Sequence, residues 1–310
     1  MAPLEAPFAE LVTSHRCTHV ACVDASLESH ALAHPDFRLD VTRNRNVTSD
    51  DRLWLRAFPP RGHTGRPVAI VVLEGRLRLA RAGEVVCAGA GEVVRLPSRE
   101  GFLSRREGPR FTSVALEWTP GTLARTPACL AAVDPMPRPD LAMIQGAVDR
   151  VASASADLRD WEALLAVLGA RGVLSHPTGP MDLTASPPGG VARLSAALDQ
   201  LLSDLSQRPM LVDLERATGK CSRQIHRLVA SFHARYGFDA SGWRDALNRR
   251  RLLVGTALMT APGATVGLVA AAIGYGSRTA FWRAFAAADL PPPTVVAHRV
   301  REPDSALLSA

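Results

Sequence analysis

The chain has 310 residues, of which 47% are hydrophobic, and this is enough for two domains with cores of their own. Its 36 basic and 30 acidic side chains give a net charge of +6, which suits a polyanionic partner without requiring one. No apolar run approaches the ~20 residues that a bilayer requires, and the N-terminus lacks the basic start of a signal peptide, so we expect a cytoplasmic protein with no membrane partner.

A cluster of histidine and cysteine lies near the N-terminus, at His15, Cys17, His19 and Cys22. The two histidines are four residues apart, the spacing of neighbours on one helical face, and thiolates and imidazoles bind soft metals. The spacing matches no closed zinc pattern, and free cysteine is a common core residue. We therefore predict no metal site here. The chain has five cysteines, an odd number with no Cys-x-x-Cys pair, which fits reduced thiols.

Between Phe37 and Trp118 the pattern is typical of short strands separated by Gly and Pro. The predicted strands are Arg52 to Phe58, Pro67 to Leu73, Arg76 to Ala80, Glu84 to Cys87, Glu92 to Leu96, and Phe111 to Trp118. Strands at this near-regular spacing predict a small antiparallel β-barrel or sandwich. Two turn sequences, Val72-Leu-Glu-Gly75 and Gly91-Glu-Val-Val-Arg-Leu-Pro97, resemble those of cupin barrels.

An enzyme of the cupin type would need three or four convergent nitrogen and oxygen ligands for its metal. Here His63 stands alone, and no histidine lies between Thr64 and Met136. We therefore predict a barrel with no catalytic residues, metal or cofactor, in which His63 and Arg66 are loop residues. It would form a binding cavity or serve a purely structural role. The candidate cavity-lining residues are Trp54, Arg56, Ile70, Val72, Arg95 and Phe111.

Helical periodicity returns between Asp140 and Ala170. Apolar residues recur at helical spacing along two edges. The first edge consists of Leu141, Ile144 and Val148, and the second consists of Leu158, Trp161, Leu165 and Leu168. These helices pack either on the barrel or on a second subunit, as in a homodimer. Turn-forming residues then predict a flexible linker. The predicted organisation is a barrel over 1–125, a helical packing segment over 126–177, a linker over 178–190 and a last domain over 191–303.

The last domain begins with a first pair of short helices. Residues 211–219 form an apolar-periodic helix that ends at Gly219, and a second helix begins near Lys220 and continues through Ile225. Trp243, Leu247 and the arginine run that follows predict a long connecting helix. From Val191 to Pro303 we count 15 Arg and Lys against 8 Asp and Glu, so this domain carries the positive charge.

A second pair of short helices follows in residues 264–285. Apolar residues recur at helical spacing up to Ile273, Gly274 allows a tight turn, and Ser277 is placed to cap the next helix. The apolar residues of that helix are Phe281 and Phe285. This pattern predicts a helix-turn-helix, the unit that inserts its second helix into a DNA major groove.

The order Ala270, Gly274-Tyr275, Phe281, Arg283, Phe285 and Pro293 resembles the second helix-turn-helix of AraC/XylS-type transcription regulators. The match covers about residues 193 to 300 and includes the upstream unit. The stretch before Gly237 is longer than the family usually has, so we expect the first recognition helix either to be longer or to sit differently in its groove. Leu290 stands where the family commonly has glycine. The resemblance implies a cupin-like sensor domain before the DNA-binding domain, double-stranded DNA and RNA polymerase as partners, and a small-molecule effector or dimerisation as the control.

We take Ile225 and Phe281 as the buried anchors of the two recognition helices. The resemblance then places the following residues toward DNA: Arg223, Gln224, His226, Arg227, Ser277, Arg278, Thr279, Trp282 and Arg283. Arginine binds guanine bidentately, and threonine offers its methyl group to thymine. Two alternatives stay open: a cupin-type enzyme or ligand-binding protein with a helical dimerisation domain, and a DNA-binding protein whose barrel only dimerises.

Overall fold

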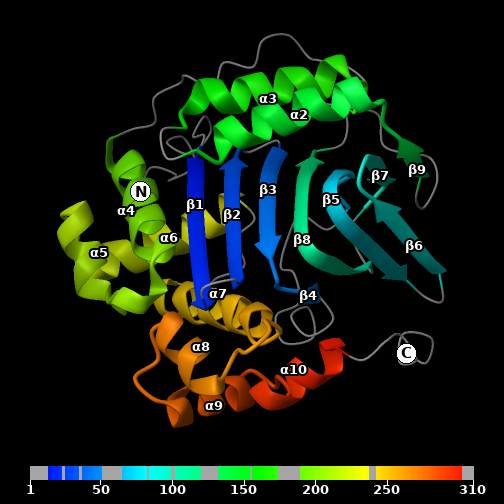
Figure 1. Cartoon of the computed structure of the whole chain (residues 1–310). Helices are drawn as coiled ribbons and strands as arrows, with labels where there is room; N and C mark the ends of the chain where they lie inside the picture. The colour runs from blue at the N-terminus through cyan, green and yellow to red at the C-terminus, as the bar shows by residue number, and fades with distance from the viewer. Residues whose placement is uncertain are drawn as a thin grey trace.

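The computed structural model describes residues 13–22, 25–34, 37–50, 65–81, 84–98, 102–119, 132–153, 156–173, 189–236 and 242–301. An antiparallel sheet precedes a C-terminal group of helices (Figure 1), so the predicted α+β class is confirmed. Among the helices in these ranges, none is long and apolar enough to cross a membrane.

The described N-terminal residues contain nine strands, all in one sheet. They are β1 (Thr13–Cys22), β2 (Ala25–Ala33), β3 (Phe37–Arg45), β4 (Ser49–Asp50), β5 (Val68–Arg81), β6 (Glu84–Gly89), β7 (Glu92–Leu96), β8 (Leu103–Trp118) and β9 (Ala132–Pro135). Every described pairing is antiparallel, along the path β1-β2-β3-β8-β5-β7-β9, with β4 on β8 and β6 on β5.

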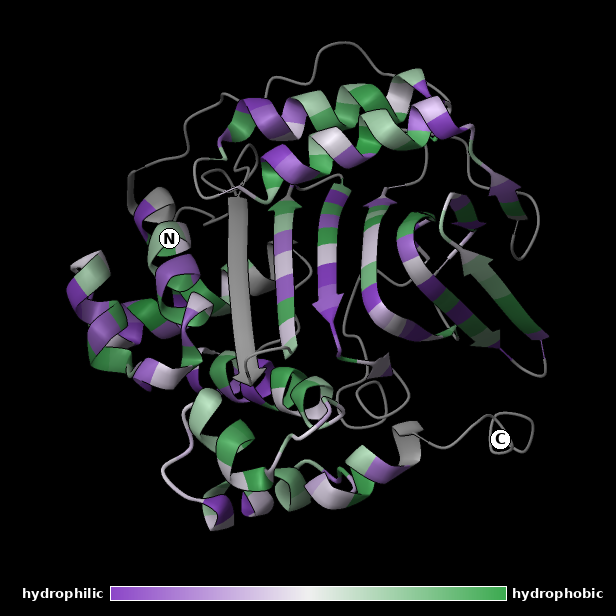
Figure 2. Ribbon diagram, viewed as in Figure 1, coloured by the Kyte–Doolittle hydropathy of each residue, from purple (hydrophilic) through white to green (hydrophobic). Residues whose placement is uncertain are grey.

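Alternation along β5 and β8 gives the sheet two apolar faces. One face, which includes Val71 and Val114, packs against α2 (Arg138–Val151) and α3 (Leu158–Ala170). Figure 2 shows hydrophobic residues recurring along both helices, and Ile144 and Trp161 are among those buried against the sheet. Of the two predicted alternatives for these helices, the structure shows packing on the sheet of the same chain.

Strand β5 is continuous where the sequence predicts two strands. Gly75 has φ +83°, and a Cβ there would lie 2.6 Å from the Arg110 carbonyl oxygen, so the close approach of the two strands at this point requires glycine. Strand β5 is paired with β8 on both sides of this glycine. Irregular pairing on either side of Glu74 shifts the alternation by one residue. Leu77 therefore lies on the same face of the sheet as Val72, opposite the face that packs against α2 and α3.

The first three strands are not among those predicted. The segment with the histidine and cysteine cluster is strand β1, not the helix that the metal interpretation considered. The strand β9 occurs within the segment predicted to be helical, before α2. The predicted strand over Arg52 to Phe58, the loop residue His63 and the linker residues 178–188 lie outside the described residues.

The C-terminal part is helical throughout its described residues. Its elements are α4 (Gly189–Ser203), the 3₁₀ helix η2 (Leu205–Gln207), α5 (Leu211–Thr218), α6 (Ser222–Tyr236), α7 (Trp243–Leu258), α8 (Val266–Ala272), α9 (Arg278–Ala287) and α10 (Pro293–Arg301). We call α5 with α6 the first motif and α8 with α9 the second motif. Helix α7 connects the two motifs in sequence and lies next to the lower end of the sheet in Figure 1.

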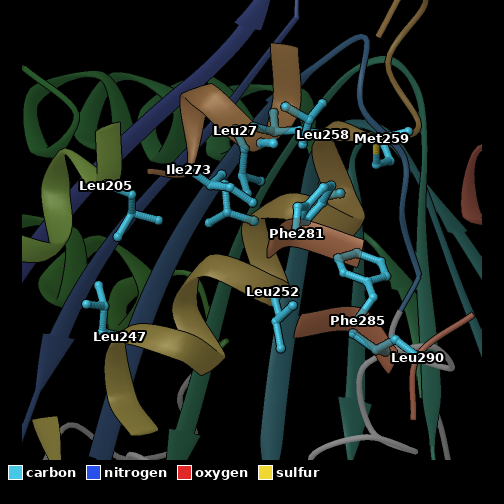
Figure 3. Packing of buried hydrophobic residues seen from close by; sticks show 14 of the residues in the cluster. Leu27, Leu205, Leu247, Leu252, Leu258, Met259, Ile273, Phe281, Phe285 and Leu290 are labelled. Atoms are coloured by element: carbon cyan, nitrogen blue, oxygen red, sulfur yellow. The ribbon is translucent and has the colours of Figure 1, made fainter. Parts of the chain in front are cut away.

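The sheet and the helical domain share one hydrophobic core. Leu27 of β2 and Val47 lie in the same buried cluster as Leu258, Ile273 and Phe281. Figure 3 shows Leu27 beside Leu258 and Ile273. Two threonines join the domains through hydrogen bonds next to this core. The Thr48 N–H donates to Thr260 Oγ1 (2.9 Å), which also lies 3.1 Å from the Thr48 carbonyl oxygen.

Candidate nucleic-acid interface

Local hydrogen bonds define both ends of α5. The Met210 N–H donates to the Asp213 carboxylate (2.8 Å), which places an acceptor at the N-terminus of the helix. At the other end Gly219 has φ +66°, and its N–H donates to the Glu215 carbonyl (2.8 Å). This left-handed residue ends the helix and turns the chain toward α6. The predicted end of the first helix at Gly219 is confirmed.

Helix α6 carries the first set of predicted DNA contacts. Its anchor Ile225 is fully buried in the core, together with Val229 and Phe232, as predicted. Arg223, Gln224, His226 and Arg227 are all exposed on the opposite side. The Gln224 Oε1 also accepts the Cys221 N–H (3.3 Å), so Gln224 helps to fix the start of the helix. Helix α6 spans 15 residues and α9 spans 10.

The second motif has a cap at the start of each helix and the predicted turn between them. Thr265 Oγ1 accepts the Leu268 N–H (3.2 Å) at the start of α8. Gly274 has φ +82°, and a Cβ there would lie 2.1 Å from the Leu205 carbonyl oxygen. The turn therefore needs glycine both for its backbone angle and for its close approach to η2. Ser277 Oγ then accepts the Ala280 N–H (3.1 Å) and caps α9, as predicted.

Helix α9 separates buried and exposed residues in the way that a recognition helix requires. Phe281 and Phe285 are buried, and their rings meet edge to face at 4.7 Å. The predicted contacts Ser277, Arg278, Thr279, Trp282 and Arg283 are exposed. Trp282 is 40% exposed.

Helix α7 holds the second motif through close contacts. At Gly255, a Cβ would lie 2.8 Å from Ile273 Cδ1 and 3.1 Å from the Phe281 ring, so a larger residue here would force these side chains to shift. The Tyr275 hydroxyl donates to Asn248 Oδ1 (3.1 Å). The guanidinium of Arg251 lies 5.5 Å over the Tyr275 ring. Burial raises the pKa of Tyr275, so this phenol stays protonated at neutral pH and can donate.

The structure brings together only some of the predicted cavity-lining residues of the N-terminal domain. Ile70, Val72 and Phe111 are buried in one cluster, on the face of β5 and β8 opposite the one that packs against α2 and α3. Arg95 lies elsewhere, because it pairs with Ala69, whose side chain packs on the opposite face. The Arg95 guanidinium forms an ion pair with Asp134 and donates to the Gly172 carbonyl (3.0 Å). Trp54 and Arg56 lie outside the described residues.

The arrangement that results is two helices, α6 and α9, that each bury one side in a shared core and expose the other. Figure 3 shows α7 side chains Leu247, Leu252 and Leu258 in the same region as Ile273, Phe281 and Phe285 of the second motif. The first motif enters this core through Ile225 and Leu214. Neither recognition helix can therefore turn relative to the other without disturbing buried contacts.

No family model matches the chain, and no curated protein matches it. Among solved structures, ToxT from Vibrio cholerae is 10% identical, with a TM-score of 0.36 over 86% of this chain and 100% of that chain. ToxT with a bound unsaturated fatty acid is 12% identical, with a TM-score of 0.32 over 84% and 94%. The AraC-like transcriptional activator CuxR is 13% identical, with a TM-score of 0.29 over 73% and 80%. All three TM-scores lie below 0.5.

Proposed function

We propose that this protein is a sequence-specific, DNA-binding transcription regulator of the AraC/XylS type. The observation that carries the proposal is the pair of helix-turn-helix motifs mounted on one connecting helix. In both motifs the apolar anchor, Ile225 or Phe281, is buried, while arginine and other polar side chains face outward. A scaffold that only dimerised would need no such exposed set on two separate helices. The proposal assigns no catalytic step to any residue.

In this proposal α6 and α9 enter successive major grooves on one face of the duplex. Such grooves lie ~34 Å apart, so the two helices must be held at a fixed spacing. The shared core around α7 supplies that rigidity. Arg223, Arg227 and Arg283 would bind guanine or phosphate, and Thr279 would contact thymine. His226 and Trp282 would add contacts at the edges of the two helices.

The N-terminal domain would control DNA binding through the core that it shares with the helices. Leu27 and Val47 touch the cluster that positions α8 and α9, and Thr48 is hydrogen-bonded to Thr260. An effector, a second copy of the chain or RNA polymerase that favoured one arrangement of this core would change affinity for DNA. A ligand with equal affinity for both arrangements would change nothing.

Selection of bound sequences from a random duplex library, repeated at two salt concentrations, tests the proposal. We expect enrichment of a site with two parts about one helical turn apart. Retention without enrichment would leave only the sequence-independent phosphate interaction. An absence of retention under both conditions would overturn the proposal and return the ligand-binding alternative to first place.

A further inference from the structure

A cavity of about 1170 Å³ lies within the DNA-binding domain, between the first motif and α7. Its lining includes Pro209 and Leu211 at the start of α5, His226 of α6, and Trp243 and Arg251 of α7. We call it the α5–α7 cavity. His226 belongs to the first recognition helix, and Arg251 lies over Tyr275 in the turn of the second motif. The cavity therefore extends from one recognition helix toward the turn that precedes the other.

Two arginines lie beside the 274–276 turn, and one of them, Arg251, lines this cavity. Arg251 is half-buried, and its Nε is shielded from solvent with no hydrogen-bond partner among the described residues. Arg208 directly precedes the lining residue Pro209. Its Nη1 lies 3.8 Å from where a Cβ of Gly276 would be, next to the cap of α9. A Cβ on Gly274 would lie 3.0 Å from the Arg251 Nη2, so both guanidinium groups lie beside the 274–276 turn. Burial, together with the charge of Arg208, lowers the pKa of Arg251.

Neither cation is neutralised by a carboxylate in the described part of the chain. The contrast with Arg249 is direct, because the Arg249 Nε binds Asp245 at 2.9 Å on the same helix. Arg208 also has φ +53°, an unfavourable backbone conformation for arginine. Arg208 is exposed and Arg251 is half-buried, and two like charges held side by side without an acid repel each other unless an anion binds between them. Arginine is the residue best suited to such an anion when it is a phosphate, which it binds bidentately.

We propose that Arg208 and Arg251 bind a phosphate of the DNA backbone at the mouth of the α5–α7 cavity. This inference rests on the proposed function. If α6 and α9 occupy successive major grooves, the intervening minor groove and its phosphates pass between the two motifs. In this arrangement the paired arginines would face those phosphates, because they lie beside the turn of the second motif. The exposed Arg244, at the start of α7, also lines the cavity and adds positive charge to its rim.

Phosphate contacts fix the register of a protein on the duplex and carry no direct sequence information. The two arginines would thus set the distance between the bases read by α6 and those read by α9. Each such contact adds about 0.9 to the slope of log affinity against log salt concentration. Over a fourfold range of salt, one contact corresponds to roughly a 3.5-fold change in affinity.

The test measures the salt dependence of DNA binding by the full chain carrying Arg208→Asn or Arg251→Gln. Asparagine tolerates the left-handed conformation at position 208, and glutamine keeps a planar polar group at position 251. Arg159→Gln on α3 is the matched control, because it removes an exposed positive charge outside the DNA-binding domain. The probes are a mixed-sequence duplex, the selected operator and, without DNA, inorganic phosphate.

We expect the salt slope to become shallower by about 0.9 in each variant on both duplexes, with base preference unchanged and the control equal to wild type. Unchanged slopes in both variants would overturn the proposal, as would a change of base preference at one position. If inorganic phosphate bound to wild type while both variants kept the wild-type salt slope on DNA, the cavity would be assigned to a free oxyanion instead. If Arg251→Gln unfolds, Arg208→Asn decides the question. Failure of wild type to bind any duplex would reject the proposed function itself.

Discussion

Replacement of Gly274 by alanine tests how the turn of the second motif packs against η2. Gly274 has φ +82°, and an L-residue in this conformation costs about 1–2 kcal/mol. A Cβ would also lie 2.1 Å from the Leu205 carbonyl oxygen. Since that oxygen is part of the backbone, η2 must move away from the turn, and such crowding costs about 1–3 kcal/mol. We expect Gly274→Ala to lower the free energy of unfolding by about 2–5 kcal/mol.

The first motif provides the matched control for this experiment. Gly219 occupies the corresponding turn with φ +66°, but no atom lies within 4 Å of the position that its Cβ would take. Gly219→Ala should therefore lose only the conformational contribution of about 1–2 kcal/mol. Urea unfolding followed by tryptophan fluorescence gives both values. Equal losses at the two glycines would show that contact with Leu205 does not constrain Gly274, and would refute the reasoning.

Three further substitutions test the interface and its supports. Arg283→Ala should weaken operator binding by about 1–3 kcal/mol and relax preference at one base pair, as measured by titration and repeated selection. Unchanged preference would remove Arg283 from the base-reading set. Ser277→Ala should lower the free energy of unfolding by about 1 kcal/mol, while Ser277→Thr keeps most of the cap. Thr260→Val leaves the Thr48 N–H without its acceptor and should cost about 1–3 kcal/mol in urea unfolding. Thr260→Ser is its control, and wild-type stability of the valine variant would contradict a contribution from this bond.

The helical half of the fold follows closely from local sequence signals. Gly219, Gly274 and Ser277 each meet a specific backbone requirement, and such requirements are visible in a single sequence. The buried anchors Ile225 and Phe281 then fix which side of each recognition helix faces outward. For this reason the predicted DNA-facing residues lie together on exposed surfaces.

The sheet was harder to predict because its alternation is masked by long-range packing. Strand β3 does alternate, with Phe37, Leu39 and Val41 buried, so this signal could have been found. At β5, Gly75 looks like the end of a strand, whereas contact with β8 carries the strand through it. The side to which Arg95 points depends on its register with β5, and register is a property of the partner strand.

The arginines of the α5–α7 cavity were beyond sequence reasoning for a different reason. Arg208 lies between helices, where no periodic pattern applies, and Arg251 is one of three successive arginines on α7. Only the folded chain brings Arg208 beside the turn of the second motif and Arg251 over Tyr275. A pair of residues 43 positions apart in sequence carries no local signal of its proximity.

The core shared by the sheet and the helices has a consequence for dissection of the protein. A fragment beginning at Gly189 would contain both motifs but would lose Leu27 and Val47, which cover part of the cluster around Leu258 and Ile273. Water would then reach apolar surface that is dry in the intact chain, and exposed patches of this kind promote self-association. Fragments intended for crystallisation or DNA binding would therefore need polar replacements on that surface, or the β-strand region supplied in trans.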